Sequence, residues 1–428
     1  MIEKVSKKFD NKPEKAVIIG LSADNMKLSD RSSDESLDEL EALLETAGGI
    51  CLGKVLQNRK SPDSRTFIGE GKLAEVKEIA KANECDLVVF DNELSPSQMR
   101  ALTEDLELRV LDRSSLILDI FADRAKTREG RLQVELAQYK YLLPRLTRMW
   151  THLVSQTGAG SSTPIGTRGP GETQLETDRR HIRRKIDKLE DELADVIRTR
   201  DTQRKLRKKN NIPVVALVGY TNAGKSTLLN TLTGAGIQAE NRLFDTLDTT
   251  TRRMRVSDTQ EVLLSDTVGF IRKLPHHLVD AFKATLEELK YADLLLHVID
   301  ASNPEWQEQA SVVDRLIIEL GAGDTPRLEV FNKCDIITAD VRLRGDNIVE
   351  ISAITKQGID ELLNKIEEIL SSAKKKTTLR LPYSIAGAVE TLHRENAVIK
   401  AEYLDDYIEV EVILTPALYD KMKSYEMV

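Results

Sequence analysis

Residues 212–230 constrain the fold of this chain more than any other stretch. They begin with an apolar, β-branched run and continue into the pattern Gly219-x-x-x-x-Gly224-Lys225-Ser226. A strand that enters a Gly-rich turn and then a helix is the setting of a P-loop, whose backbone N–H groups and helix N-terminus face phosphate groups. The sequence therefore predicts a buried strand, a phosphate-binding turn and a helix that begins at Lys225.

Each residue type in this loop suits an anion. Glycines let backbone amides approach phosphate oxygens without a Cβ atom in the way, the Lys225 ammonium reaches the β- and γ-phosphates, and the Ser226 hydroxyl ligates Mg²⁺. The alternative is a Gly-rich turn that matches the pattern by chance, which the flanking strand and helix disfavour. We therefore assign to nucleotide binding the residues Gly219, Tyr220, Thr221, Asn222, Ala223, Gly224, Lys225 and Ser226.

Three further motifs follow the P-loop in the order that a GTPase requires. The Asp266 carboxylate ends a predicted strand and would hold Mg²⁺ through water, while the Gly269 N–H can sense the γ-phosphate. The Asp335 carboxylate can accept two N–H donors from the guanine edge, a pair that adenine lacks. These motifs predict GTP as the nucleotide and add to its site Asp266, Thr267, Val268, Gly269, Asn332, Lys333, Cys334, Asp335, Ser352 and Ala353.

A hydroxyl-rich segment, residues 243–253, is predicted to be a switch. One of its threonines should complete the Mg²⁺ shell when the γ-phosphate is present, but spacing does not choose among Thr246, Thr249, Thr250 and Thr251. Phe270 stands where Ras-like enzymes place a water-orienting glutamine. Because phenylalanine can neither polarise nor orient water, we expect slow intrinsic hydrolysis that a partner or another segment stimulates.

Composition limits the class of protein. The 428 residues are 40% hydrophobic and 31% charged, which is typical of globular domains in solution. The net charge of −8 argues against a uniformly basic nucleic-acid-binding surface. Three distant cysteines suggest neither a disulfide framework nor a zinc site, and no apolar run is long enough to cross a bilayer. We therefore expect a cytoplasmic protein without a membrane span.

The pattern of strands and helices divides the chain into four predicted domains. Residues 1–113 form a smaller α/β domain, in which strands and helices alternate as in a parallel sheet. Residues 211–372 form the P-loop domain, a doubly wound α/β fold with nucleotide at the carboxyl ends of its strands. Residues 373–428 form a small α+β domain, which starts after a linker at Ala373–Thr378.

Residues 114–210 are predicted to be helical around one long loop. Ser114–Leu146 has helical periodicity, and Pro144 is expected to kink or end it. Gln156–Thr173 contains five glycines and two prolines, so we expect no regular element there, only a flexible linker or a functional loop. Thr177–Asn210 is predicted to be a long helix with a second helix that folds back on it.

The last of these segments carries a local positive charge. Arg179–Lys209 holds 13 Lys/Arg and six Asp/Glu, opposite in sign to the chain as a whole. A solvated helix face and a contact with RNA phosphates both account for this clustering.

Several strings extend beyond general nucleotide motifs, and they are spread over most of the chain. They are Phe67-Ile-Gly-Glu-Gly71, Ser95-Pro-Ser-Gln98, Leu132-Gln-Val-Glu-Leu-Ala137, Tyr141-Leu-Leu-Pro-Arg145, Arg168-Gly-Pro-Gly-Glu-Thr173 and Asp266-Thr-Val-Gly-Phe-Ile271. With the P-loop, they resemble the HflX family of ribosome-associated GTPases. The resemblance implies an N-terminal α/β domain, a helical hairpin and a G domain that bind the large ribosomal subunit and its RNA. It also implies that ribosomes are split or rescued under stress, with GTP hydrolysis permitting release.

The same resemblance assigns roles within the switch. It implies that Thr246 binds Mg²⁺ and acts in catalysis with Lys225 and Gly269. It also implies that the nucleotide is bordered by Phe244, Asp245, Thr246, Leu247 and Asp248. Asp245 replaces a common alanine of the family and Thr249 a common proline, and these departures bear on the mobility of the switch.

The predicted activity is that of a monomeric, Mg²⁺-dependent GTP hydrolase in the cytoplasm, partly bound to ribosomes. One alternative is a GTPase that works with a ribosome-assembly or RNA-modification factor. Another is a GTP-gated binding module with incidental turnover. Stimulation of hydrolysis by the large ribosomal subunit would separate these interpretations.

Overall fold

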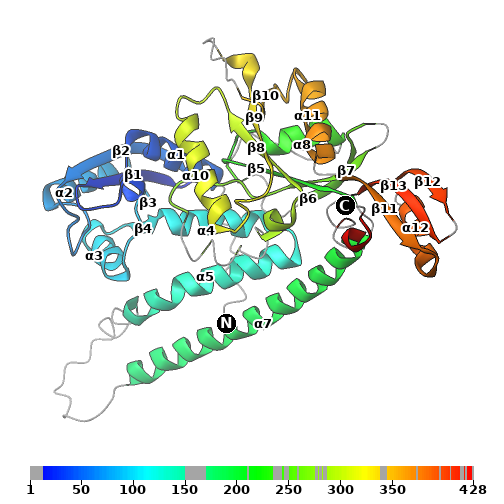
Figure 1. The fold of residues 1–428 in the computed structure, drawn as a ribbon. Coiled ribbons are helices and arrows are strands. Elements are labelled where there is room, and N and C mark those ends of the chain that lie inside the picture. Colours follow the sequence, from blue (N-terminus) through cyan, green and yellow to red (C-terminus); the bar gives the residue numbers. More distant parts are fainter. Residues whose placement is uncertain are drawn as a thin grey trace.

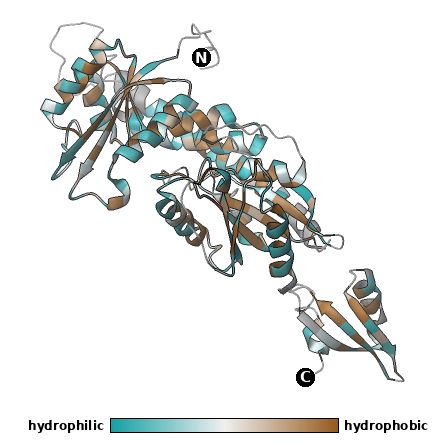
Figure 2. Ribbon diagram, turned by 90° about the horizontal axis from the view of Figure 1, so that it is seen from above, coloured by the Kyte–Doolittle hydropathy of each residue, from teal (hydrophilic) through white to brown (hydrophobic). Residues whose placement is uncertain are grey.

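Three β-sheets organise the part of the protein that a computed structural model describes (Figure 1). The structure describes residues 13–149, 170–209, 212–234, 243–244, 250–257, 260–274, 278, 282, 287–337, 345–372, 375–394, 397–404, 406–414, 419 and 422–426. The strand orders are β2-β1-β3-β4, β10-β9-β8-β5-β7-β6 and β11-β13-β12. In Figure 2 the first and last sheets lie at opposite ends of an elongated molecule. The predicted α/β class is confirmed.

The N-terminal sheet is parallel throughout. Its strands are β1 (Lys15–Ala23), β2 (Ile50–Arg59), β3 (Leu87–Phe90) and β4 (Arg109–Asp112), and its helices are η1 (Leu28–Asp30), α1 (Asp34–Thr46), α2 (Glu70–Ala82) and α3 (Pro96–Leu106). The sequence pattern does not predict β2. This strand lies at the sheet edge and buries only Val55 fully, so it has no apolar run to mark it.

The helical region contains α4 (Arg113–Arg124), α5 (Arg128–Met149) and α7 (Pro170–Lys209). The predicted run Ser114–Leu146 is therefore two helices, and α5 continues through Pro144. The prediction that a second helix folds back within Thr177–Asn210 is wrong, because α7 is a single 40-residue helix. The prediction of a loop over Gln156–Thr173 is also wrong at its C-terminal end, because α7 starts at Pro170. Proline suits a first helical turn, whose N–H groups lack intrahelical partners. The rest of that loop, up to residue 169, lies outside the described residues.

The partner that packs along α7 is α5, in antiparallel orientation (Figure 1). Ion pairs join the two helices, including Lys140 with Glu190 at 2.7 Å and Arg200 with Glu129 at 3.0 Å. Between them lies an apolar seam of Leu132, Leu136, Ile186, Leu189 and Leu193. The pair is thus held by a narrow apolar stripe with charged flanks. None of the helices in the described part is long and apolar enough to cross a membrane.

The central sheet is doubly wound, with only β6 antiparallel to its neighbour. Its strands are β5 (Val214–Gly219), β6 (Thr250–Arg255), β7 (Glu261–Asp266), β8 (Leu294–Asp300), β9 (Arg327–Asn332) and β10 (Ile348–Glu350). Its helices are α8 (Lys225–Thr233), η2 (Glu287–Tyr291), α10 (Trp306–Glu319), η3 (Cys334–Ile336) and α11 (Ile359–Ser372). The sequence pattern predicts a hairpin with strands at Arg255–Ser257 and Val262–Ser265; the structure has the hairpin, but its first strand, β6, ends at Arg255. The sequence pattern of Leu278–Lys290 predicts a helix; most of that segment lies outside the described residues, and its described end, η2, is 3₁₀.

The C-terminal sheet is antiparallel and has its own apolar core. It consists of β11 (Lys375–Pro382), β12 (Val398–Tyr403) and β13 (Tyr407–Leu414), with η4 (Tyr383–Ile385), α12 (Ala386–Arg394) and η5 (Lys423–Tyr425). The linker predicted at Ala373–Thr378 is wrong from Lys375 onward, because β11 starts there. Those residues pair with β13, so a lysine run that looks like a linker is part of a sheet edge.

One hydrophobic core joins the N-terminal domain to the central sheet. Phe121 of α4 makes edge-to-face ring contacts with Phe244 at 4.7 Å and with Phe282 at 5.0 Å between centroids. Apolar residues of β1 and α1 belong to the same core cluster as Val218 of β5. The two domains therefore share one packed interior.

Candidate nucleotide-binding site

The predicted motifs meet at the carboxyl edge of the central sheet. Gly219 ends β5, Asp266 ends β7, Asn332 ends β9, and Ser352 lies just after β10. Because β5, β7, β8, β9 and β10 run parallel, these chain positions lie along one edge. Doubly wound sheets bind ligands in this place.

Two glycines of the P-loop have no room for a side chain. A Cβ atom on Gly219 would lie 2.3 Å from the carbonyl oxygen of Val298, and one on Gly224 would lie 2.2 Å from Nδ2 of Asn332. Gly224 also has a φ of +94°, in the region that favours glycine. The loop thus packs closely on β8 and on the asparagine that ends β9.

Lys225 is buried at the start of α8. Its ammonium donates hydrogen bonds to the carbonyl oxygens of Gly219 (3.1 Å) and Tyr220 (2.8 Å), which hold it beneath the loop. Burial lowers the pKa of Lys225 to about 8, and the nearby Asp266 carboxylate opposes this shift. An anion above the loop would raise this pKa again, because an opposite charge favours the charged form of the lysine.

Ser226 and Asp266 place oxygen ligands together. The Ser226 hydroxyl donates to Oδ2 of Asp266 at 2.9 Å, so the start of α8 and the end of β7 bring a hydroxyl and a carboxylate side by side. Thr267, next along the chain, donates its hydroxyl to the carbonyl oxygen of Leu217 at 2.6 Å and so ties the two strands. Hydroxyl and carboxylate oxygens are ligands that Mg²⁺ prefers, so the residues present fit this ion.

Residues 267–270 lie directly against the P-loop. Thr221 donates its N–H to the Phe270 carbonyl oxygen at 2.7 Å, and Phe270 donates its N–H to the Gly219 carbonyl oxygen at 3.1 Å. A Cβ atom on Gly269 would lie 2.9 Å from Cγ2 of Thr221 and 3.1 Å from Nζ of Lys225. Gly269 therefore contacts both the loop and its lysine. Val268 is buried beside it, and Asn222 is exposed in the loop at a φ of +61°.

Phe270 is 1% exposed and points into the core. This burial explains why an aromatic residue replaces a water-orienting side chain: the position faces the packed interior shared with the N-terminal domain.

The base motif is built around Asn332. Its amide donates to the Ala223 carbonyl oxygen at 2.9 Å, and its Oδ1 accepts the N–H of Ala353 at 3.0 Å. One side chain therefore joins the P-loop to the segment after β10. Ser352 is fully buried beside it, and the Cys334 N–H donates to the Ile351 carbonyl oxygen at 3.1 Å.

The two charged residues of this motif differ in their surroundings. Lys333 has a φ of +66°, and its ammonium lies 2.7 Å from the carboxylate of Asp300, which ends β8. Asp335 is exposed on η3. Sequence reasoning missed Asp300, whose only signal is its place at a strand end.

The switch is only partly described. Phe244 is 2% exposed and packs on Phe121. The expectations for Asp245, Thr246, Leu247, Asp248 and Thr249 fall outside the described residues. Thr250 and Thr251, two of the threonines that spacing left open, lie in β6, where the Thr251 hydroxyl donates to that of Ser265 at 3.3 Å.

A doubly wound sheet with this P-loop, an Asp266 strand end and an Asn332–Asp335 motif defines a P-loop GTPase. The chain belongs to the HflX family of GTPases. It is 47% identical over 409 residues to GTPase HflX of Lacrimispora saccharolytica, and this match covers 95% of each chain. It is 47% identical over 378 residues to GTPase HflX of Escherichia coli, and this match covers 87% of each chain.

Three family descriptions match consecutive parts of the chain. They are "GTP-binding GTPase N-terminal" over residues 34–122, "GTP-binding GTPase Middle Region" over 124–207 and "50S ribosome-binding GTPase" over 214–333. A solved structure of a GTP-binding protein from Sulfolobus solfataricus with GDP is 26% identical, has a TM-score of 0.44 and covers 83% of this chain and 98% of its own.

Proposed function

We propose that the chain binds GTP at the edge formed by Gly219–Ser226, Asp266 and Asn332–Asp335, and hydrolyses it to GDP and phosphate. The observation that carries this proposal is the convergence of these motifs through side-chain hydrogen bonds, above all Ser226 with Asp266 and Asn332 with Ala223. In this assignment the P-loop holds the phosphates, while Asp335, Ser352 and Ala353 hold the guanine.

Mg²⁺ would be held by Ser226 and Asp266, with Thr246 as the switch ligand that the family resemblance implies. When bound, the ion would neutralise charge on the β- and γ-phosphate oxygens. Lys225, already directed under the loop by two carbonyl groups, adds positive charge to the same phosphates. The N–H of Gly269 acts as the donor that detects the γ-phosphate.

Intrinsic hydrolysis is slow in this proposal, because buried Phe270 offers no group to the attacking water. A partner then supplies the stimulation. We propose the large ribosomal subunit as that partner, in line with the family description that matches residues 214–333. Splitting or rescue of ribosomes under stress follows as the physiological outcome, with GDP formation permitting release.

The α5–α7 helix pair is the proposed contact with ribosomal RNA. Arg180, Arg183 and Arg184 are exposed on α7, whereas Lys185 pairs with Glu135 across the two helices. The pair extends along one side of the molecule (Figure 1). Exposed guanidinium groups suit phosphate oxygens, so this surface supports binding of RNA. We propose that the protein acts as a cytoplasmic monomer, partly bound to ribosomes.

The test is GTP hydrolysis with and without purified large ribosomal subunits, using Asp335→Asn as a specificity control. Stimulated hydrolysis that the variant loses for GTP would support the proposal. Nucleotide binding without stimulation would favour the assembly-partner or GTP-gated-module interpretation, and absence of guanine nucleotide binding would contradict the proposal altogether.

A further inference from the structure

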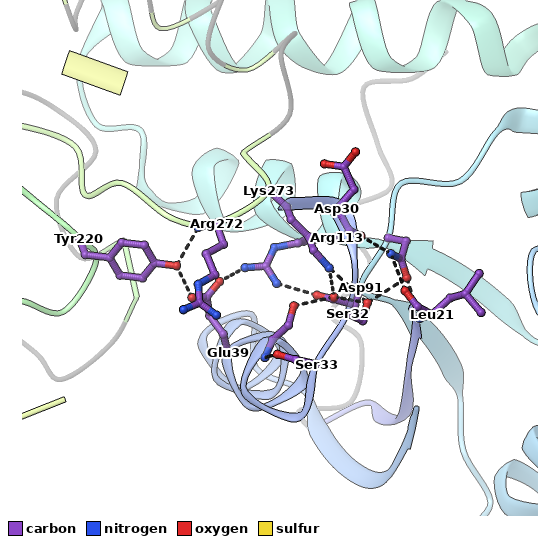
Figure 3. A network of polar contacts seen from close by, with 12 residues as sticks. Leu21, Asp30, Ser32, Ser33, Glu39, Asp91, Arg113, Tyr220, Arg272 and Lys273 are labelled. Carbon is purple, nitrogen blue, oxygen red and sulfur yellow. Dashed lines mark hydrogen bonds and ion pairs between the residues drawn. The ribbon is translucent and has the colours of Figure 1, made fainter. Parts of the chain in front are cut away.

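The side chain of Tyr220 leaves the P-loop and enters the N-terminal domain (Figure 3). Tyr220 is 4% exposed, its hydroxyl donates to the carboxylate of Glu39 on α1, and it accepts the backbone N–H of Arg272 at 2.8 Å. Burial raises the pKa of Tyr220 to about 12, so the phenol keeps the proton that it donates. One hydroxyl group thus joins the phosphate loop, the segment after Gly269 and a helix of another domain.

Glu39 is itself held in place. Arg113 is 2% exposed and forms an ion pair with Glu39 and another with Asp91, whose Oδ1 is 2.8 Å from the guanidinium. Burial lowers the pKa of Arg113 to about 10, which leaves it charged at neutral pH. A buried, charged arginine between two carboxylates fixes their orientation, because a carboxylate that turned away would lose its ion pair with the guanidinium.

The segment after Gly269 is tied to the N-terminal domain at a second point. Lys273 forms an ion pair with Asp91 and lies 3.2 Å from the Ser32 hydroxyl (Figure 3). Phe270, at the start of this segment, hydrogen-bonds the P-loop through its backbone. Residues 269–273 therefore connect the P-loop on one side to the residues just before α1 and just after β3 on the other.

We propose that Glu39 is a positioning residue for GTP hydrolysis, which acts through Tyr220 to keep the P-loop and the Gly269 segment in register. The inference rests on the proposed function, in which Gly269 detects the γ-phosphate. Glu39 contacts the loop through the Tyr220 hydroxyl, whereas the Ser226 hydroxyl bonds Asp266 and the Asn332 amide bonds Ala223. Its loss should therefore affect the hydrolytic step, while the contacts that hold GDP remain.

The experiment compares Glu39→Gln, Tyr220→Phe and the double variant by single-turnover hydrolysis and by GDP affinity in the full chain. We expect each single variant to lower the hydrolysis rate by about ten-fold, as for the loss of one buried hydrogen bond. GDP affinity should stay within about two-fold, a change too small to reflect the loss of a hydrogen bond. The double variant should be no slower than the slower single variant, because both changes interrupt the same path.

Glu41→Gln is the matched control, since Glu41 lies on the same helix but pairs with Lys54. It should hydrolyse GTP as the unaltered chain does. Three outcomes would overturn the inference alone: unchanged hydrolysis in Glu39→Gln, GDP affinity that falls in parallel with hydrolysis, or a double variant whose losses multiply. If the unaltered chain shows no hydrolysis even with large ribosomal subunits, the proposed function fails and this inference with it.

Discussion

The side-chain amide of Asn332 donates a hydrogen bond of 2.9 Å to the carbonyl oxygen of Ala223. A residue of the base motif therefore supports the phosphate loop, while Asp335 of the same motif stays exposed.

Asn332→Ala and Asp335→Asn should differ in kind. The first removes both hydrogen bonds of a buried side chain and should weaken guanine and xanthine nucleotides alike, by about 10–100-fold. The second should weaken GTP by about 10–100-fold, because a charge-assisted contact is lost. It should also improve binding of xanthosine triphosphate, whose base has a carbonyl group that accepts the new amide N–H. Titration with fluorescent GTP and XTP analogues tests this. If the ratio of GTP to XTP affinity changed equally in both variants, the prediction would be contradicted.

Nucleotide affinity should fall as the pH rises above the pKa of Lys225, which is about 8. The free site then loses its ammonium, and binding must restore a proton, at up to about ten-fold in affinity per pH unit. The stability of the folded, nucleotide-free protein depends on pH in the opposite direction. The pKa is lowered in the folded state, so the buried charge destabilises the nucleotide-free protein below pH 8, and this cost fades as the pH rises toward the unfolded value. Affinity measured from pH 7 to 9, with Lys225→Met as the control that should abolish this dependence, checks the prediction.

Arg183→Gln with Arg184→Gln should weaken binding to large ribosomal subunits and reduce the slope of log affinity against log salt by about two. Both guanidinium groups are exposed on α7. Arg315→Gln, at an exposed position on α10, is the matched control and should bind as the unaltered chain does. Sedimentation with ribosomal subunits over a salt series is the measurement. An unchanged slope in the double variant would exclude these two arginines as phosphate contacts.

Phe270→Gln should not create a faster GTPase. The position is 1% exposed in the core, so the amide would be buried without solvent and should destabilise the protein by about 1–3 kcal/mol. We expect a lower Tm and no gain in intrinsic hydrolysis, whereas Phe270→Leu should cost less stability because it stays apolar. Faster hydrolysis by the glutamine variant at an unchanged Tm would show that residue 270 faces the nucleotide after all.

The described nucleotide motifs could be predicted from the sequence because each is a short string at the end of an apolar strand. The end of β7 carries Asp266, and the end of β9 carries Asn332. Parallel strands place such ends along one edge whatever the remaining details of the fold. The positions of the strands and glycines in the sequence were therefore sufficient to predict that these motifs meet at one edge of the sheet.

Other elements could not be read in this way. β2 is half-exposed, and the lysines that open β11 look like a linker, so hydrophobic pattern gives little signal for either strand. The extent of α7 was misjudged because its partner helix, α5, lies before the Gly-rich loop instead of after it. Pairing between distant segments is decided by packing, which local periodicity does not report.

The contact of Tyr220 with Glu39 lies beyond any local pattern, since 181 positions separate the two residues. A tyrosine among glycines and polar residues looks like one more variable position of the loop. Only the packing of α1 and α4 against the central sheet shows that its hydroxyl meets a carboxylate held by Arg113.

The single helix α7 also has a mechanical meaning. Its 40 residues span about 60 Å at the usual rise of an α-helix, and only four residues of sequence separate Lys209 at its end from Val214, which starts β5. A stiff rod therefore ends almost at the strand that leads into the P-loop. Force applied at the far end of the helix pair would be transmitted along α7 toward that strand.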